Sequence, residues 1–391
     1  GNSAIAVGGE EVMYRHELTY FNPTALFVDV HDEMGPEELL GRVDGVKNFT
    51  FRRVGQDLKL NGVAVRSRSG DPTRFGEAVM TILERYDLPM ILCSYSPEVL
   101  EVGLEIAAGK RPLIYAATKE NWEQVADLAI KHQVPLVASS PGDIQGLMDL
   151  VQNLVENGIQ DIVLDIGSAP SGEGLGKMMD NLAMLRRLAI EKRVKPMGFP
   201  ILGVPMVAWL GEKDPYLGAV AEVNLAAIQT LRFCDLLILH SLETWSLLPL
   251  LTLRQNIYTD PRVPIRVEAG LNPICTPTEA SPVIMTSNFA LTYYTVVNDL
   301  EVAKTPCYLL AVDTEGLAVE VSMAGGKLTA EKVKEVLDGA KVAEKVAHKK
   351  LIIPGKAARI SGDIEDQTGW QVLVGPIDSS RIPEYIKQNW K

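Results

Sequence analysis

The segment "PLIYAATKENWEQVADLAIKHQVPLVASS", residues 112–140, contains two apolar runs separated by an amphipathic stretch. Continuous apolar runs of this length are typical of strands that are buried on both faces of a parallel sheet. Residues 118–132, between the runs, place apolar side chains at spacings of three and four, which predicts a helix. The segment is therefore a predicted strand–helix–strand unit.

The same unit recurs along the first two thirds of the chain. We expect strands at residues 25–30, 89–94, 112–117, 135–140, 161–166, 200–205, 236–241 and 256–261. Eight parallel strands that alternate with helices close most simply into a TIM (β/α)8 barrel, and a doubly wound open sheet is the alternative. The regularity of the eight units favours the barrel, which we place at residues 1–275.

One irregular stretch lies between the first two expected strands. Residues 49–67, "FTFRRVGQDLKLNGVAVRS", alternate between polar and apolar positions. Asn61-Gly62 within this stretch is a hairpin signal, because both residues tolerate the positive φ of a type I′ turn. We therefore expect an antiparallel excursion there.

A second, smaller α/β domain is expected at residues 276–391. It follows a Pro- and Gly-rich stretch, residues 262–283, that reads as a linker. Residues 286–302 predict a helix with Thr286 or Ser287 near its N-cap. Apolar runs at 307–313, 317–323, 350–355 and 370–376 predict strands, most of them followed by glycine, around a long helix at 329–348. Ligands of open α/β sheets bind at such strand ends, so this domain is the expected ligand-binding part.

Composition excludes several classes of partner. The 391 residues include 38 basic and 50 acidic side chains, and a net charge of −12 argues against nucleic acid or anionic lipid. No apolar run approaches the ~20 residues that cross a bilayer. The four cysteines, Cys93, Cys234, Cys275 and Cys307, are too scattered to form a disulfide framework or a CxxC metal site. These features are typical of a reduced, cytoplasmic protein without a membrane span.

The stretch "FVDVHDEMG", residues 27–35, poses a separate question. Many cobalamin-binding domains carry Asp-x-His-x-x-Gly, in which the histidine is an axial cobalt ligand. Asp29 and His31 fit that pattern, but Met34 stands where the glycine belongs and Gly35 comes one residue late. We expect His31 to be a barrel-end residue that is hydrogen-bonded by a neighbouring carboxylate, and not a metal ligand.

Long blocks of the sequence resemble one family. The blocks are "EEVMYRHELTYFNPTALFVDVHDEM" (10–34), "TSNFALTYYTVVNDLE" (286–301), "SMAGGKLTAEKV" (322–333), "IPGKAARISGDIED" (353–366) and "TGWQVLVGP" (368–376). The chain resembles the large (gamma) subunit of the corrinoid iron–sulfur protein of the acetyl-CoA synthase/CO dehydrogenase (Wood–Ljungdahl) pathway. The resemblance implies a TIM barrel followed by a small Rossmann-like α/β domain that binds a cobamide, a cobalamin-type corrinoid.

The function implied by the resemblance is that of a methyl carrier. Cobalt would cycle between Co(I) and methyl-Co(III), taking methyl from methyltetrahydrofolate (or a methanopterin) and passing it to the nickel site of acetyl-CoA synthase. The implied partners are a small barrel subunit in a heterodimer, the methyltetrahydrofolate methyltransferase, acetyl-CoA synthase and an ATP-dependent reductive activator. A methyl-carrying subunit is expected more than an independent enzyme, and no catalytic residue is assigned.

Two further features of the family bear on the metal. The resemblance implies that cobalt is bound base-off without a protein histidine, which agrees with our interpretation of His31. Family members also begin with a domain whose clustered cysteines hold a [4Fe–4S] cluster. This chain has no cysteine before Cys93, so we expect that domain to be absent from it.

The residues that we expect to contact the cobamide share two properties: they offer hydroxyl or amide groups to the corrin rim, or they are small residues at strand ends. They are Thr286, Ser287, Asn288, Phe289, Thr292, Gly316, Gly325, Gly326, Leu328, Thr329, Gly355, Ala357, Gly375 and Pro376. Thr329 is also a good N-cap for the helix that follows it, and Phe289 could equally be a core aromatic.

A rival interpretation concerns the barrel. TIM-barrel enzymes act at the carboxyl ends of their strands. Polar residues follow the expected strands at Asp29, Ser94, Ser140, Asp165, His240 and Asp260. The stretch "VLDIGSAPSGEG" (163–174) is weakly similar to pterin-binding barrels. A pterin-dependent methyltransferase is therefore the alternative function, and a purely structural barrel is a third interpretation.

Overall fold

Strand β1 (Ala25–His31) shows why the barrel strands are apolar on both faces. Ala25 and Phe27 pack in a cluster inside the barrel, whereas Leu26 and Val28 pack in the cluster beneath the helices.

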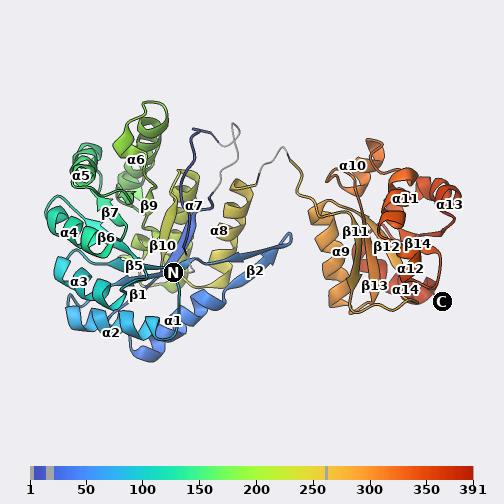
Figure 1. Cartoon of the computed structure of the whole chain (residues 1–391), viewed down its shortest axis with the longest axis horizontal. Coiled ribbons are helices and arrows are strands. Elements are labelled where there is room, and N and C mark those ends of the chain that lie inside the picture. The colour runs from blue at the N-terminus through green and yellow to red at the C-terminus, as the bar shows by residue number, and fades with distance from the viewer. Residues whose placement is uncertain (1–3, 15–21, 260–262, 391) are drawn as a thin grey trace. The chain divides into compact units, whose positions relative to one another are not determined.

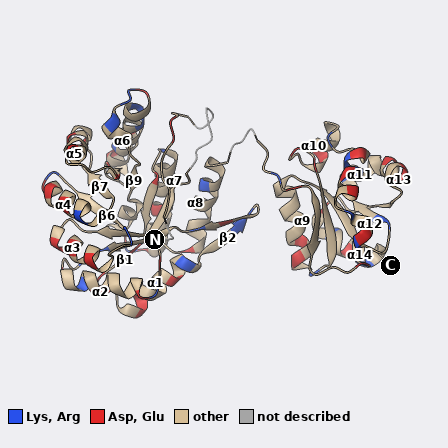
Figure 2. Cartoon of the chain, in the orientation of Figure 1, with Lys and Arg blue, Asp and Glu red and all other residues tan. Residues whose placement is uncertain are grey.

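A computed structural model of the chain describes residues 4–14, 22–259 and 263–390. Charged residues lie mainly on the helices and loops, while the strands are largely uncharged (Figure 2).

Eight parallel strands form the barrel in the order β8-β7-β6-β5-β4-β1-β10-β9. They are β1, β4 (Gly62–Arg66), β5 (Met90–Cys93), β6 (Leu113–Ala117), β7 (Leu136–Ser139), β8 (Ile162–Asp165), β9 (Leu202–Gly203) and β10 (Leu236–Leu239). A parallel bridge between Leu164 and Ile201 joins the two ends of this sheet. The Leu164 amide also donates to the Pro200 carbonyl at 2.7 Å. The expected TIM barrel is thus confirmed.

Helices surround the barrel strands (Figure 1). They are α1 (Pro36–Asn48), α2 (Pro72–Leu83), α3 (Pro97–Ile106), α4 (Trp122–His132), α5 (Ile144–Glu156), α6 (Gly172–Ile190), α7 (Pro215–Leu231) and α8 (Thr244–Ile257), with the short 3-10 turns η1 (Lys195–Met197) and η2 (Pro205–Trp209). Several begin with proline after a capping side chain. The Asp71 carboxylate, for example, accepts a hydrogen bond from the Thr73 amide at 2.8 Å. No described helix is long and apolar enough to span a bilayer.

Two expectations for the barrel strands were wrong. In the run at 256–261, the described residues 256–259 are not a strand, because residues 256 and 257 belong to the last turn of α8. The eighth barrel strand is instead β4, which was not among the expected strands. It pairs in parallel with β1 and β5. Asn61-Gly62 is therefore not a hairpin turn. A two-stranded sheet, β2 (Thr50–Arg53) and β3 (Gln56–Lys59), lies just before it, and Val54 and Gly55 between those strands have positive φ.

Strand packing explains the Asn61-Gly62 pair. The side-chain oxygen of Asn61, Oδ1, accepts a hydrogen bond from the Leu26 amide at 2.9 Å. A Cβ atom on Gly62 would lie 2.2 Å from the Pro89 carbonyl oxygen, so only glycine fits where β4 passes its neighbour. The pair is thus required by close approach within the barrel and not by a turn.

The chain divides into two compact units. The first comprises Gly1–Phe51 and Asp57–Thr259, and the second comprises Asp260–Lys391 with the short stretch Arg52–Gln56. This division falls earlier than the expected boundary after residue 275. Part of the expected linker is also ordered as strand β11 (Gly270–Ile274), which pairs antiparallel with β13. Its position at the sheet edge accommodates Pro273, which cannot donate to a neighbouring strand.

The second unit is an open sheet with the strand order β11-β13-β12-β14-β15. Its strands are β11, β12 (Val283–Ser287), β13 (Cys307–Val312), β14 (Lys350–Ile353) and β15 (Gln371–Val374). Its helices are α9 (Ala290–Val302), α10 (Val319–Ala324), α11 (Ala330–Gly339), α12 (Val342–Lys345), α13 (Ser361–Thr368) and α14 (Ile382–Asn389), with 3-10 turns η3 (Gly355–Ile360) and η4 (Ser379–Arg381). The last four strands are parallel to one another.

Helices cover both faces of this sheet (Figure 1). Side chains of α9 and α14 pack with Ile284 and Leu309 on one face. Side chains of α10, α11 and α13 pack with Met285 and Leu310 on the other. The expected small α/β domain is therefore present as a three-layer sandwich.

Three local expectations in this unit need correction. Thr286 and Ser287 end strand β12 and do not cap a helix, because helix α9 begins later with Phe289 as its N-cap. The run at 317–323 is not a strand but mostly helix α10. The long helix at 329–348 is broken between α11 and α12, where Lys341 has a φ of +49°.

Candidate functional site

A cavity of about 310 Å³ lies at the carboxyl ends of the parallel strands in the second unit. Its walls include residues from the carboxyl-terminal halves of β12 and β14, which are adjacent strands. The chain leaves β12 toward β13 on one side and reaches β14 on the other, so the strand order reverses between them. Such a switch point leaves a crevice outside the sheet and is where open α/β folds bind ligands.

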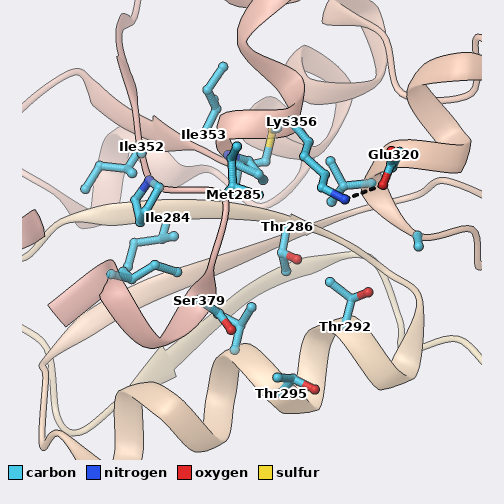
Figure 3. Close-up of a pocket in the computed structure, with 18 of the residues that line it drawn as sticks. Ile284, Met285, Thr286, Thr292, Thr295, Glu320, Ile352, Ile353, Lys356 and Ser379 are labelled. Carbon is cyan, nitrogen blue, oxygen red and sulfur yellow. Dashed lines mark hydrogen bonds and ion pairs between the residues drawn. The ribbon is translucent and has the colours of Figure 1, made fainter.

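The cavity wall combines apolar side chains with hydroxyl groups (Figure 3). Thr286 lies at the end of β12, while Thr292 and Thr295 project from α9. Ser379 is the first residue of η4, after β15, and its hydroxyl donates to the Asp299 carboxylate at 2.5 Å. Hydroxyl groups both donate and accept, so this wall suits a ligand with carboxamide groups on an apolar frame.

Four of the expected contact residues line this cavity. They are Thr286, Thr292, Gly375 and Pro376. Thr286 is 2% exposed and lines the cavity from a buried strand end. The structure thus brings together residues that lie about 90 positions apart in the sequence.

Asn288 and Gly316 lie in the adjoining loop and have structural partners. The side-chain oxygen of Asn288, Oδ1, accepts hydrogen bonds from the Thr314 amide, the Thr314 hydroxyl and the Gly316 amide, each at 3.0 Å. Gly316 has a φ of +77°, and a Cβ atom there would meet Pro264 at 2.9 Å. These two residues shape the loop after β13 and do not line the cavity.

The other expected contact residues do not line the cavity either, and most have roles in packing or capping. Gly325 ends α10, Gly326 has a positive φ, and Thr329 caps α11 through a 3.4 Å hydrogen bond from the Lys332 amide to its hydroxyl. Leu328 and Ala357 are buried in the core, Phe289 is the N-cap residue of α9, and a Cβ atom on Gly355 would lie 2.9 Å from the Gly375 carbonyl oxygen. Ser287 is fully buried, and its hydroxyl has no hydrogen-bond partner among the described residues.

Most lining residues were not expected from the sequence. They include Thr295, Glu320, Lys356, Ile377 and Ser379. All but Thr295 follow the ends of strands β13, β14 and β15, so the strand-end rule could have found them. Lys356 and Glu320 form an ion pair at the side of the cavity (Figure 3).

The mouth of the barrel, formed by the carboxyl ends of its strands, contains a second polar cluster. Asp29, in β1, is fully buried and accepts a 2.6 Å hydrogen bond from His240 Nδ1. The guanidinium groups of Arg66 and Arg42 lie 2.9 and 3.6 Å from its two carboxylate oxygens. Burial alone would raise the pKa of Asp29, but the His240 hydrogen bond and these positive charges hold it below its usual value. Asp29 is therefore an ionised carboxylate that fixes His240.

A buried glutamate fixes the loop that carries His240. The Glu222 carboxylate, from α7, accepts hydrogen bonds from the amides of His240 and Ser241 at 2.5 and 2.8 Å. Burial raises the pKa of Glu222, and these hydrogen bonds oppose the rise. The ring of Trp209 meets the His240 ring edge-on at 4.8 Å. Asp29 and Trp209 thus contact the imidazole of His240, while Glu222 fixes its main chain.

A cavity of about 420 Å³ also opens at this end of the barrel, beside β8. Asp165 lines it and accepts hydrogen bonds from Tyr115, Ser139 and the Gly167 amide, each at 2.8 Å. Burial raises the pKa of Asp165. Ser94, Ser140 and His240 follow barrel strands as expected, whereas Asp260 lies outside the described residues.

The expected carboxylate partner of His31 is absent from the described contacts. His31 Nε2 lies 3.5 Å from the Arg68 guanidinium, and His31 Nδ1 has no hydrogen-bond partner among the described residues. Burial lowers the pKa of His31, and the charges of Arg66 and Arg68 lower it further. The expectation was wrong because the adjacent carboxylate, Asp29, points to His240 instead.

Fold and cavity together define a two-unit α/β protein, in which a closed parallel barrel is joined to an open sheet with a ligand-sized cavity at its switch point. The family described as "CO dehydrogenase/acetyl-CoA synthase delta subunit" matches residues 1–386. The chain belongs to this family.

Similar proteins carry a related description. The chain is 47% identical over 393 residues to "Acetyl-CoA decarbonylase/synthase complex subunit gamma 2" of Methanosarcina thermophila, covering 100% of this chain and 84% of that protein. It is 45% identical to the gamma subunit of Methanothermobacter thermautotrophicus, covering 98% and 83%. Among solved structures, that of dihydropteroate synthase from Thermus thermophilus aligns with 60% of this chain and 95% of its own chain, with 19% sequence identity and a TM-score of 0.44.

Proposed function

We propose that the chain is a methyl-carrying subunit of an acetyl-CoA decarbonylase/synthase-type complex and that its second unit binds a cobamide. The family match and the gamma-subunit relatives support a role in such a complex. The observation that carries the cofactor assignment is the switch-point cavity, whose wall of threonines and branched apolar residues is described above.

The chemistry of this wall fits a cobamide. A corrin ring is an apolar macrocycle with a rim of carboxamides, which both donate and accept hydrogen bonds. The hydroxyls of Thr286 and Thr292 can pair with either kind of group. Ile284, Val319 and Ile352 offer apolar surface between them.

The size of the cavity implies partial enclosure. Pockets for drug-sized ligands run from about 300 to 1,000 Å³, and this one, at about 310 Å³, lies at the lower end of that range. A cobamide is larger than a drug-sized ligand, so the cavity would hold only part of it. The part of the cobamide outside the cavity would be left for a partner subunit to cover. This agrees with a carrier that binds several other proteins.

The second unit offers no free imidazole as a cobalt ligand. Its single histidine, His348, has both ring nitrogens in hydrogen bonds, Nε2 with the Ser281 carbonyl at 3.0 Å and Nδ1 with the Lys350 amide at 3.2 Å. This arrangement supports base-off binding without a protein nitrogen ligand. When bound, the cobamide supplies a cobalt ion that accepts and releases a methyl group, while the protein binds and orients it.

A titration of the corrin-free protein tests this function. We expect the full chain to bind one equivalent of a cobamide, with the absorption spectrum of the base-off form. Electron paramagnetic resonance of Co(II) should show no nitrogen superhyperfine splitting, and His31→Ala should leave the spectrum unchanged. Absence of binding, or splitting that disappears in the His31 variant, would contradict the assignment.

A pterin-dependent methyltransferase is the second function that a specific observation favours. The cavity beside Asp165 lies where TIM-barrel enzymes bind substrates, and a buried carboxyl group can pair with the amino-pyrimidinone edge of a pterin. The fixed imidazole of His240 could exchange a proton with a ligand at the same barrel end. Binding of a tetrahydropterin by protein that binds no corrin would favour this function over the carrier.

A further inference from the structure

The Lys356–Glu320 ion pair at the switch-point cavity joins two segments that follow different strands. Lys356 lies in η3, directly after β14, and Glu320 lies in α10, after β13. Their side chains are 43% and 71% exposed. Exposed ion pairs contribute little to stability, so this one can exchange its partner at small cost.

Lys356 and Glu320 are the charged side chains among the described residues that line the cavity. The rest of the wall is apolar or carries hydroxyl groups. In Figure 3 the pair lies to one side of Thr286, with the long side chain of Lys356 extending to the Glu320 carboxylate. A ligand that places a negative charge in this cavity therefore has Lys356 as its cationic partner.

We propose that Lys356 binds the phosphodiester of the cobamide's nucleotide tail and that Glu320 holds the lysine until the phosphate replaces it. This inference rests on the proposed function. A cobamide carries one phosphodiester between its corrin ring and its lower base. Moving that anion next to apolar side chains is unfavourable unless a cation accompanies it. A lysine ammonium is a common phosphate partner, and Lys356 is placed at the wall to serve as one.

The proposal gives the two charged residues opposite effects on binding. Removing the Lys356 ammonium leaves the phosphodiester without a counter-charge, so affinity falls. Removing the Glu320 charge frees the lysine and removes a carboxylate that repels the phosphate, so affinity rises. A purely structural role for the ion pair predicts instead that both changes act alike.

Three corrins separate the phosphate contact from the ring contacts. Cobinamide has the corrin ring without phosphate, ribose or base, cobinamide phosphate restores the phosphate, and aquocobalamin carries the whole tail. The dissociation constant of each is measured by equilibrium dialysis with the full chain and with Lys356→Ala, Lys356→Arg and Glu320→Gln. Lys327→Ala is the matched control, because Lys327 pairs with Glu315 at similar exposure in the same unit and does not line the cavity.

We expect Lys356→Ala to weaken binding of aquocobalamin and cobinamide phosphate by at least about tenfold. The same variant should change cobinamide binding by less than about twofold. Lys356→Arg should retain most of the affinity, Glu320→Gln should strengthen binding of the two phosphate-bearing corrins, and Lys327→Ala should change nothing.

Two results would overturn the inference, and they differ from failure of the proposed function. Equal weakening for all three corrins would make Lys356 a ring or structural contact, and no weakening for any would remove it from the site. If the unaltered chain binds none of the three corrins, the proposed function itself fails.

Discussion

A Thr292→Trp variant is expected to lose cobamide binding by more than about a hundredfold, equivalent to nearly 3 kcal/mol of binding free energy. Thr292 is half-buried in the first turn of α9 and lines the switch-point cavity. An indole in its place would fill a large part of a space of about 310 Å³ and would remove a hydroxyl. Because the side chain points to a cavity and not into packed core, the substitution should leave the fold intact.

Two matched variants make this result interpretable. Glu301→Trp places the same bulk on an exposed position of the same helix, outside the cavity, and should bind the cobamide normally. Thr292→Ser keeps the hydroxyl and should bind within a few-fold of the unaltered chain. Retained affinity in Thr292→Trp, with thermal unfolding unchanged, would show that the cofactor lies elsewhere.

An Asp29→Asn variant is expected to destabilise the first unit by about 3 kcal/mol. Removing one partner of a buried ion pair typically costs ~3–5 kcal/mol, and the lower end applies because Arg66 and Arg42 keep partial access to water. The control is Glu33→Gln, which removes the exposed partner of Arg68 and should change stability by less than about 1 kcal/mol. Urea unfolding at neutral pH measures both.

The sign of the pH dependence provides a second check on Asp29. Its pKa is lower in the folded chain than its ordinary value of 3.8, so the unfolded chain holds the proton more tightly. Its contribution to stability is therefore present above the unfolded-state pKa and is lost as the pH falls through the folded-state pKa. The difference in stability between the unaltered chain and Asp29→Asn should shrink as the pH falls below about 4. A difference that is small at neutral pH, or that grows in acid, would contradict the ion-pair account.

The barrel could be predicted from the sequence because a strand buried on both faces has few alternatives to a continuous apolar run. The one misplaced strand shows the limit of that signal. Asn61-Gly62 has the composition of a hairpin turn, but tertiary contacts with Leu26 and Pro89 decide its conformation. The strand predicted at residues 317–323 was also wrong, because a short apolar run does not distinguish a strand from a buried helix.

The candidate site could be predicted only in part. The sequence indicated strand ends in the second unit, and Thr286, Thr292, Gly375 and Pro376 line the cavity. It could not show which strand ends are neighbours, since that depends on the order β13-β12-β14-β15. Glu320 and Lys356 also follow strand ends, but they were missed because the expected contacts were chosen among hydroxyl, amide and small residues. The resemblance to a family could be seen from long blocks of sequence without knowing the strand order. The family match confirms the assignment to the CO dehydrogenase/acetyl-CoA synthase system.

Hydrogen–deuterium exchange of the full chain, with and without one equivalent of cobamide, tests the central claim most directly. The account predicts slower exchange on loading in residues 284–295, 318–320, 352–356 and 375–379, which contain most of the residues that line the switch-point cavity. Exchange around Asp29, Asp165 and His240 at the barrel mouth should stay unchanged. Protection confined to the barrel mouth, with none at the ends of β12 and β14, would contradict the assignment of the cobamide to the second unit.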